Sequence, residues 1–375
     1  MLSIVTLSAF LVYCQYLLGM LTPSATGLVI FPFCAFFLLT ILGSNSRFSL
    51  FFVLSCVVLI LVLTLSFANS SLASYPQYKF LFTTIKWVSY LIIGYYVYSN
   101  SYAYFRVAFF VLLIFSIYCL GSIFVGNYEF DINNRLFVGV YNPIWIGRAI
   151  YEMLLISIVC LGVKKNYTII LFIVCLYISY ATGSKSSILA FLIVATLYFS
   201  REMQMSKVKK FILFSLLVLF VISILYFFKD DAYFQSRFLS LVPENSSDGV
   251  YNSSRIVVWP KTLSLFLSQN YMEILFGNGL GEFPKFYLGV EANFKYYPHN
   301  AILELLVEFG LLFTLAIVFY VTYFYLKCKE SIRYLLLYYI ICAMFSGDLL
   351  LNEFVFLYLG MVIKSVRYTS FKVAM

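Results

Sequence analysis

The segment "PHNAILELLVEFG" opens a long apolar run and holds the only histidine of the chain, His299. Asn300, Glu304 and Glu308 follow at intervals of four residues, which places them on one stripe of a helix. The start of such a helix directs backbone N–H groups and a positive dipole end toward an anionic ligand. The residue types therefore suit a polar site for an anion. The simpler interpretation is that Asn300 caps the helix while His299 lies at an interface.

Three further places carry a cation beside small or polar residues. Arg255 lies in "NSSRIVVWP", Lys185 in "TGSKSSILAF", and Arg148 in "YNPIWIGRAIYEM". Each suits contact with phosphate, but each also has a simpler interpretation: a solvated charge for Arg255, a snorkelling lysine for Lys185, and an i, i+4 ion pair of Arg148 with Glu152. The alternating glycines of "FGNGLGEF" lack the strand–turn–helix setting of a dinucleotide-binding loop and predict a turn.

The composition decides what kind of protein must position these residues. Of the 375 residues, 63% are hydrophobic and only 11% are charged, far more apolar than a soluble core requires. The chain is predicted to be an all-α polytopic membrane protein with about twelve transmembrane helices. The expected spans are Leu2–Met20, Gly27–Leu42, Ser49–Phe67, Phe80–Tyr98, Phe105–Val125, Ile144–Val163, Tyr167–Thr182, Ser186–Ser200, Phe211–Phe228, Ala301–Leu326, Tyr334–Phe345 and Leu349–Ile363.

The charges between the spans predict the orientation. Basic residues gather in alternate breaks, including "REMQMSKVKK" and "KCKESIR", so these breaks and both termini are expected in the cytoplasm. The net charge of +9 then reports topology, and no nucleic-acid partner is expected, since no basic surface interleaved with aromatic residues suggests one.

One break is much longer than the others and divides the chain. We expect residues 1–228 to form transmembrane helices 1–9, residues 229–299 a large periplasmic loop between helices 9 and 10, and residues 300–375 helices 10–12 with a cytoplasmic tail. A loop of this length is usually functional or disordered. Its portion "WPKTLSLFLSQNYMEILFG" predicts an amphipathic helix at the interface. The loop has no cysteine, so no disulfide framework is expected there.

Taken together, these features resemble the O-antigen polymerase and ligase superfamily, and within it the Wzy-type O-antigen polymerases. The likeness covers the number of spans, the large loop, the "GxGxGxF" turn and "PHNxxLExxxExG", with weaker echoes near Arg148 and Lys185. The family often has Ser-Arg where this chain has Ser184-Lys185. Lysine keeps the charge but loses the planar fork that grips two phosphate oxygens.

The resemblance implies a metal-independent, GT-C-like membrane glycosyltransferase at the periplasmic face of a bacterial inner membrane. The glycan on undecaprenyl diphosphate would be transferred to a second lipid-linked repeat unit. His299 would activate or orient the acceptor hydroxyl, with Glu304 orienting the histidine or the sugar. Arg255 would be the third catalytic residue and, with Lys185 and Arg148, would bind the diphosphate, whereas Asn300 would contact substrate.

Two other functions stay open. An O-antigen ligase would hand the same glycan to a lipid A-core acceptor, and the shared motifs do not separate it from a polymerase. A lipid-linked sugar transporter is disfavoured because the two halves show no internal repeat. The expected partners are the lipid-linked oligosaccharide, the bilayer and a chain-length regulator. No cofactor is expected and no metal, since a metal site needs several convergent ligands.

Overall fold

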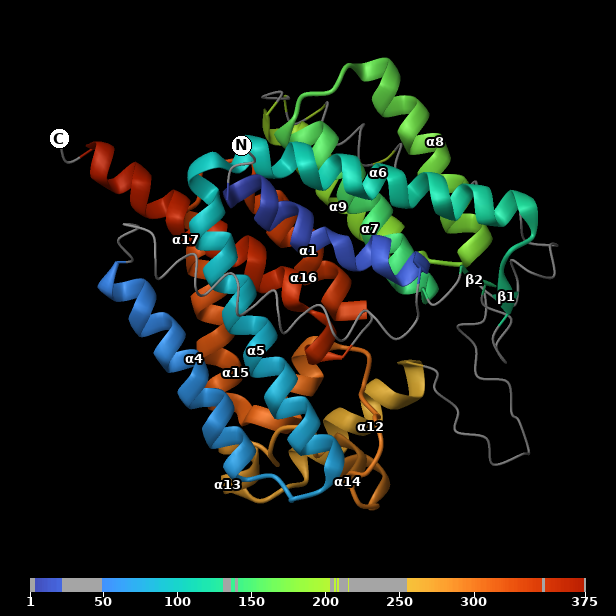
Figure 1. The fold of residues 1–375 in the computed structure, drawn as a ribbon. Coiled ribbons are helices and arrows are strands. Elements are labelled where there is room, and N and C mark those ends of the chain that lie inside the picture. Colours follow the sequence, from blue (N-terminus) through green and yellow to red (C-terminus); the bar gives the residue numbers. More distant parts are fainter. Residues whose placement is uncertain are drawn as a thin grey trace. The chain divides into compact units, whose positions relative to one another are not determined.

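The computed structural model describes residues 4–21, 49–130, 136–138, 141–202, 255–345 and 348–373, with a few single residues between 203 and 254. Helices dominate these residues, and one short antiparallel ladder joins β1 (Glu129–Phe130) to β2 (Leu136–Phe137) (Figure 1). The chain is an all-α polytopic membrane protein, as predicted.

Five helical runs in the described part are long and apolar enough to cross a membrane: Leu50–Ala68, Ser74–Val125, Pro143–Cys160, Lys165–Thr182 and Ala301–Lys327. Their bounds match several predicted spans to within a few residues. Ser74–Val125 merges two of them, since α5 (Ser74–Val97), the short helix η1 (Tyr98–Asn100) and α6 (Ser101–Val125) follow without a break. The spans predicted at 27–42 and 211–228 lie outside the described residues, so the count of twelve stays a prediction.

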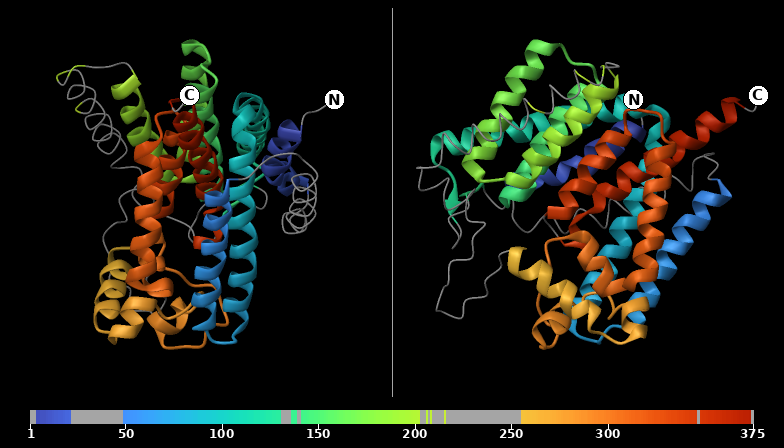
Figure 2. Two further views of the ribbon diagram at one scale, coloured as in Figure 1. Left: turned by 90° about the vertical axis from the view of Figure 1, so that its left-hand side faces the viewer. Right: turned by 180° about the vertical axis from the view of Figure 1, so that it is seen from behind.

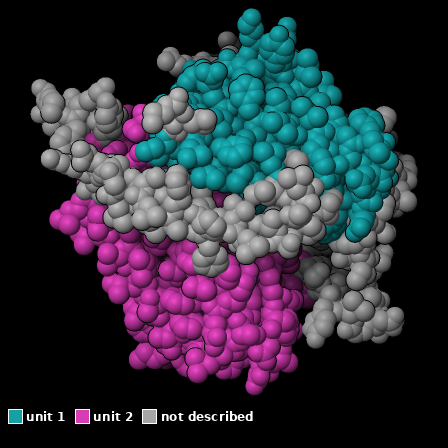
Figure 3. Space-filling model, viewed as in Figure 1, with its two compact units in different colours: residues 1–33, 100–245 teal, residues 34–99, 246–375 magenta. Residues whose placement is uncertain are grey.

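The chain divides into two compact units that alternate along the sequence (Figure 3). Unit 1 comprises residues 1–33 and 100–245, and unit 2 comprises residues 34–99 and 246–375. The predicted divisions at residues 228 and 299 concern membrane topology and remain predictions.

Unit 1 is built around α7 (Pro143–Leu155), which continues into a π-helical turn, Ile156–Cys160. Nearly every residue of α7 is buried. Its neighbours are α6, α8 (Lys165–Thr182) and α9 (Lys185–Glu202), while α1 (Ile4–Leu21) packs on α6. Gly147 permits a close approach to α9, because a Cβ there would lie 2.0 Å from the Ser184 hydroxyl.

In unit 2, the long helix α5 packs most extensively on α17 (Glu353–Val373). Glycines allow their backbones to meet: a Cβ at Gly94 would lie 1.8 Å from the Leu357 carbonyl oxygen, and one at Gly360 would lie 2.1 Å from that of Leu91. Such contacts through small residues are typical of membrane helices. Around this pair lie α4 (Leu50–Ala68), α15 (Ala301–Lys327), α16 (Arg333–Phe345) and the short helix η4 (Leu349–Leu351).

Three short helices gather at one end of α15 (Figure 2): α12 (Arg255–Leu267), α13 (Tyr271–Phe276) and α14 (Phe283–Leu288). We call residues 255–300 the cap of unit 2. The single amphipathic helix predicted here is wrong, because the chain breaks between Leu267 and Tyr271. Asn270 ends this break by accepting a hydrogen bond from the Glu273 N–H (3.0 Å), which makes it the N-cap of a new helix.

Candidate functional site

His299 has an unusual backbone conformation. Its φ of 57° makes it the single non-glycine residue with positive φ among the described residues. This left-handed region costs an L-residue roughly 1–2 kcal/mol, and such strain tends to persist at functional sites. The imidazole ring lies 4.4 Å from the Tyr297 ring, measured between centroids.

The cap is attached to the backbone beside His299. The Trp259 indole Nε1 of α12 donates a hydrogen bond of 2.8 Å to the carbonyl oxygen of Pro298. Val258, Phe283, Tyr287 and Val307 form a buried core that joins α12 and α14 to α15, with Trp259 and Tyr296 packed against it. Arg255 is the first residue of α12, one turn before Trp259. The structure therefore brings the helix that starts with Arg255 next to the segment that carries His299.

Asn300 is the N-cap of α15. Its Oδ1 accepts hydrogen bonds from the backbone N–H groups of Ile302 (3.0 Å) and Leu303 (3.2 Å). The capping interpretation is confirmed for this residue. Its predicted contact with substrate stays a prediction.

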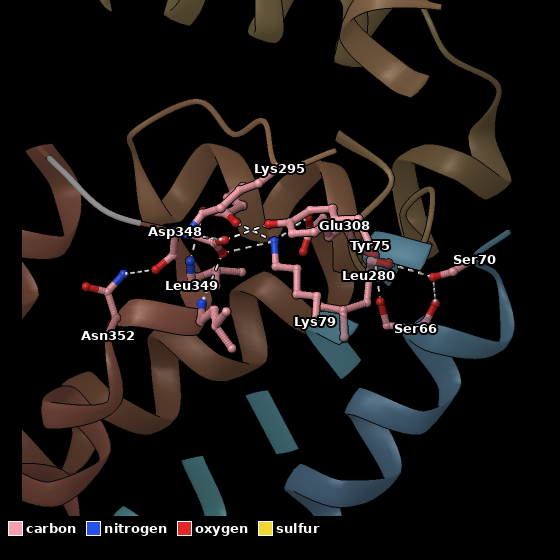
Figure 4. Close-up of polar contacts among 12 residues, drawn as sticks. Ser66, Ser70, Tyr75, Lys79, Leu280, Lys295, Glu308, Asp348, Leu349 and Asn352 are labelled. Atoms are coloured by element: carbon pink, nitrogen blue, oxygen red, sulfur yellow. Dashed lines mark hydrogen bonds and ion pairs between the residues drawn. The ribbon is translucent and has the colours of Figure 1, made fainter. Parts of the chain in front are cut away.

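A buried cluster of charges includes two carboxylates from the first turns of α15 (Figure 4). The Lys79 ammonium of α5 donates to the Glu304 carboxylate at 2.5 Å and to that of Glu308 at 2.6 Å, and it lies 3.2 Å from Asp348 Oδ1. All four side chains are fully buried. Such charges are costly unless they are closely paired. We call Lys79, Glu304, Glu308 and Asp348 the lysine cluster.

Asp348 ties this cluster to two further side chains. Its Oδ2 accepts a hydrogen bond of 2.6 Å from the Tyr75 hydroxyl and lies 3.5 Å from the Lys295 ammonium of the cap. Burial alone would raise the pKa of Asp348, but the charges of Lys79 and then Lys295 hold that pKa below its usual range. The cluster therefore joins the cap to α5, α15 and the turn before α17.

The Glu304 side chain is fully buried, whereas the role predicted from sequence is to orient His299 or the sugar. Besides its ion pair with Lys79, it accepts a hydrogen bond of 3.2 Å from the Leu349 N–H through its second oxygen. These contacts suit a residue that fixes the start of α15. The catalytic role assigned to Glu304 stays a prediction.

The glycine-rich turn braces α15 from the other side. Gly310 interrupts the helix with φ 76° and ψ 175°, and the Val307 carbonyl oxygen, three residues earlier, accepts the backbone N–H of Asn278 at 2.8 Å. A Cβ at Gly277 would lie 2.5 Å from the Glu308 carbonyl oxygen, and one at Gly310 would lie 2.4 Å from that of Leu275. The turn predicted at "FGNGLGEF" thus packs its backbone directly against the break in α15.

Unit 1 holds the other two predicted residues, Arg148 and Lys185. Arg148 is buried on α7, and Lys185 is the half-buried first residue of α9. Gly147 and Ser184, their respective neighbours in sequence, are in close contact, so both cations lie near one α7–α9 junction. Glu152 accepts a hydrogen bond of 2.6 Å from the Tyr13 hydroxyl.

Sequence reasoning missed Lys79, Asp348 and Trp259. For Lys79 and Asp348 the available signal was the cost of ionisable residues at membrane depth, which makes both of them candidates for a site or an ion pair. Lys79 directly precedes a predicted span, and Asp348 lies in the break before the last one. Within the described residues, no group of three or more histidine, cysteine or acidic side chains could hold a metal ion. Metal independence itself remains a prediction.

The fold and these residues define a multi-pass membrane protein with polar groups gathered at the start of a kinked helix. Residues 170–319 match a family described as O-antigen ligase. The matched segment contains Lys185, Arg255, His299 and Glu304, but not Arg148 or Lys79. The match supports the O-antigen ligase and polymerase superfamily and, with it, a membrane glycosyltransferase-like enzyme of O-antigen biosynthesis. No curated protein matches the chain.

Proposed function

We propose that the chain is an O-antigen polymerase. It transfers a glycan from undecaprenyl diphosphate to a second lipid-linked repeat unit at the periplasmic face of a bacterial inner membrane. A chain-length regulator is its proposed protein partner. The single observation that carries the proposal is His299: it holds a strained left-handed conformation between Pro298, which Trp259 anchors, and the N-cap Asn300, inside the family-matched segment.

The reaction divides between an acceptor and a leaving group. His299 takes or orients the proton of the acceptor hydroxyl, because an imidazole nitrogen can act as a general base or hydrogen-bond acceptor for a hydroxyl. Arg255 meets the negative charge that develops on the departing diphosphate. Lys185 and Arg148 are the further cations proposed for the diphosphate. Glu304 acts through Lys79 by keeping the start of α15, and with it His299, in place.

A ligase is the second candidate, and the description of the matched family favours it. The two reactions share the donor and the leaving group and differ in the acceptor. A polymerase extends a lipid-linked repeat unit, whereas a ligase delivers the glycan to lipid A-core.

The lipopolysaccharide pattern of a deletion strain separates these functions. Loss of a polymerase leaves core with a single repeat unit, and loss of a ligase leaves bare core. We expect the single-repeat pattern, restored to a full ladder by the wild-type gene but not by His299→Ala at equal membrane abundance. Bare core would assign the chain as a ligase, and a full ladder with His299→Ala would remove the acceptor-side residue.

A further inference from the structure

The cap carries a polar pocket that the proposed reaction does not yet use. It has a volume of about 520 Å³, within the range of roughly 300–1,000 Å³ of small-molecule sites. The turn between α4 and α5 contributes Asn69, α12 and α13 contribute residues such as Gln269 and Glu273, and α14 contributes Lys285 and Phe286. All of these elements belong to unit 2.

Glu282, at the start of α14, gives this pocket an unsatisfied polar group. Its side chain is 2% exposed, and it lines the pocket. Oε1 accepts a hydrogen bond of 2.5 Å from the Ser71 N–H. Oε2 has no hydrogen-bond partner within the described part of the chain. A buried carboxylate oxygen without a donor is costly, and a hydroxyl group entering the pocket would supply that donor.

The charges of the pocket select against a phosphate. Two carboxylates, Glu273 and Glu282, accompany one lysine, Lys285. The amides of Gln269 and Asn278 also line the pocket and hydrogen-bond each other at 2.6 and 3.2 Å, which fixes their orientation. Carboxylate and amide groups match the hydroxyls of a sugar, and the Phe286 ring offers an apolar surface to a sugar's C–H face.

A second pocket continues past Lys285. It has a volume of about 580 Å³, shares Lys285 and is lined by the turn Ser71–Ser74 and by residues that follow α14, including Glu291 and Asn293. Ser71, whose N–H binds Glu282, belongs to this second pocket. Two adjoining pockets of this size suit several linked sugar residues more than a single one.

From these observations we infer that the cap binds the glycan itself, as an oligosaccharide subsite separate from the diphosphate contacts, with Glu282 accepting a hydrogen bond from a sugar hydroxyl. This inference rests on the proposed function, because it names the part of the substrate that this surface holds. Binding the sugar chain here would hold it next to the segment that carries His299, since α12, α14 and that segment share one core.

Blocking the pocket from an exposed position tests the inference without disturbing the buried framework. Ser268 lines the first pocket, is exposed, and donates its hydroxyl to the Leu265 carbonyl oxygen three residues back. Ser268→Trp should fill the pocket. Ser99 is a matched control, because it is an exposed serine of unit 2 with the same contact to the Tyr96 carbonyl oxygen, beyond the opposite end of α5.

The measurement is saturation-transfer NMR with the full-length protein in nanodiscs. The probe is the oligosaccharide released by mild acid from the polysaccharide of the source strain. Wild type and Ser99→Trp should bind it equally, and Ser268→Trp should weaken binding at least tenfold. Glu282→Gln, of nearly the same size, should weaken it about tenfold through loss of one charge-assisted hydrogen bond. Equal binding by wild type and Ser268→Trp, or no binding by wild type, overturns the inference.

The same variants separate this inference from the proposed function. If Ser268→Trp loses oligosaccharide binding while the deletion strain shows bare core, the subsite stands and the polymerase assignment fails. If the ladder depends on His299 while Ser268→Trp binds like wild type, the polymerase assignment stands and the subsite fails.

Discussion

The Lys79 ammonium of unit 2 lies within 2.5–3.2 Å of three carboxylates, whereas the candidate cations of unit 1 flank a contact between Gly147 and Ser184. In unit 2 the buried Lys79 ammonium forms ion pairs that hold the first turns of α15. The strained residue His299 lies just before that helix. In unit 1 the helices come together through small residues, and Lys185 stays half-buried at a helix start. Position at membrane depth therefore does not by itself identify a catalytic charge, because one such cation serves the scaffold.

Removing the charge at the centre of the lysine cluster should have the largest effect. Lys79→Met leaves the buried Glu304 and Glu308 side chains without a counter-ion and Asp348 with Lys295 alone, and breaking a buried pair typically costs about 3–5 kcal/mol. We expect loss of the protein from membranes, or a strongly lowered midpoint of thermal unfolding in detergent.

Lys295→Met is the control, since that lysine also pairs with Asp348 but has a side chain 39% exposed. It should cost less than about 1 kcal/mol. An unfolding midpoint of Lys79→Met equal to that of Lys295→Met would mean that the cluster does not hold unit 2 together.

The break in α15 should give the next effect. Gly310→Ala places a Cβ 2.4 Å from the Leu275 carbonyl oxygen and imposes positive φ on alanine, for an expected cost of about 2–3 kcal/mol. Gly289→Ala isolates the cost of positive φ, because φ there is 71° and nothing lies within 4 Å, so about 1 kcal/mol is expected. Thermal unfolding of both variants measures the difference.

Unit 1 provides the contrasting case for this prediction. Gly147→Ala meets the Ser184 side chain at 2.0 Å instead of a carbonyl group of the main chain. Adding Ser184→Gly to the Gly147→Ala variant should therefore restore most of the stability that Gly147→Ala loses. If Gly310→Ala were no more costly than Gly289→Ala, the turn would not brace α15.

The start of α15 could be predicted from sequence because its determinants are local. Asn300 precedes a continuous apolar run, and the helix begins at Ala301 as expected. The span predicted at Ser49–Phe67 likewise corresponds to Leu50–Ala68. The lysine cluster could not be derived in this way, since Lys79 and Glu304 are 225 residues apart and their pairing depends on how α5 packs on α15. The break between α12 and α13 was missed because apolar spacing continues across it, although Asn270 caps the start of a new helix there.

Substituting His299 should have a smaller effect on stability than the changes above. Its effect on activity should nevertheless be large. Asparagine tolerates the left-handed region better than histidine does, so His299→Asn should leave the free energy of unfolding unchanged or raise it by up to about 1 kcal/mol. The polymer ladder should nevertheless collapse to the single-repeat band. Thermal unfolding and a lipopolysaccharide gel of the same variant test this combination. A full ladder would mean that the imidazole has no part in catalysis, and a destabilised variant would mean that the positive φ of His299 is not a source of strain.

The smallest expected effect is that of removing divalent metal ions. The proposed mechanism meets the diphosphate charge with fixed cations, Arg255, Lys185 and Arg148, which leaves no step for magnesium. In a reconstituted assay with purified enzyme and lipid-linked repeat units, excess EDTA should leave polymer formation essentially unchanged. Arg255→Ala should abolish it, and Arg255→Lys should recover little if two phosphate oxygens are gripped at once. If EDTA stops the reaction and magnesium or manganese restores it, these cations are insufficient, and carboxylates outside the lysine cluster, such as Asp230 and Asp231, become the ligands to test.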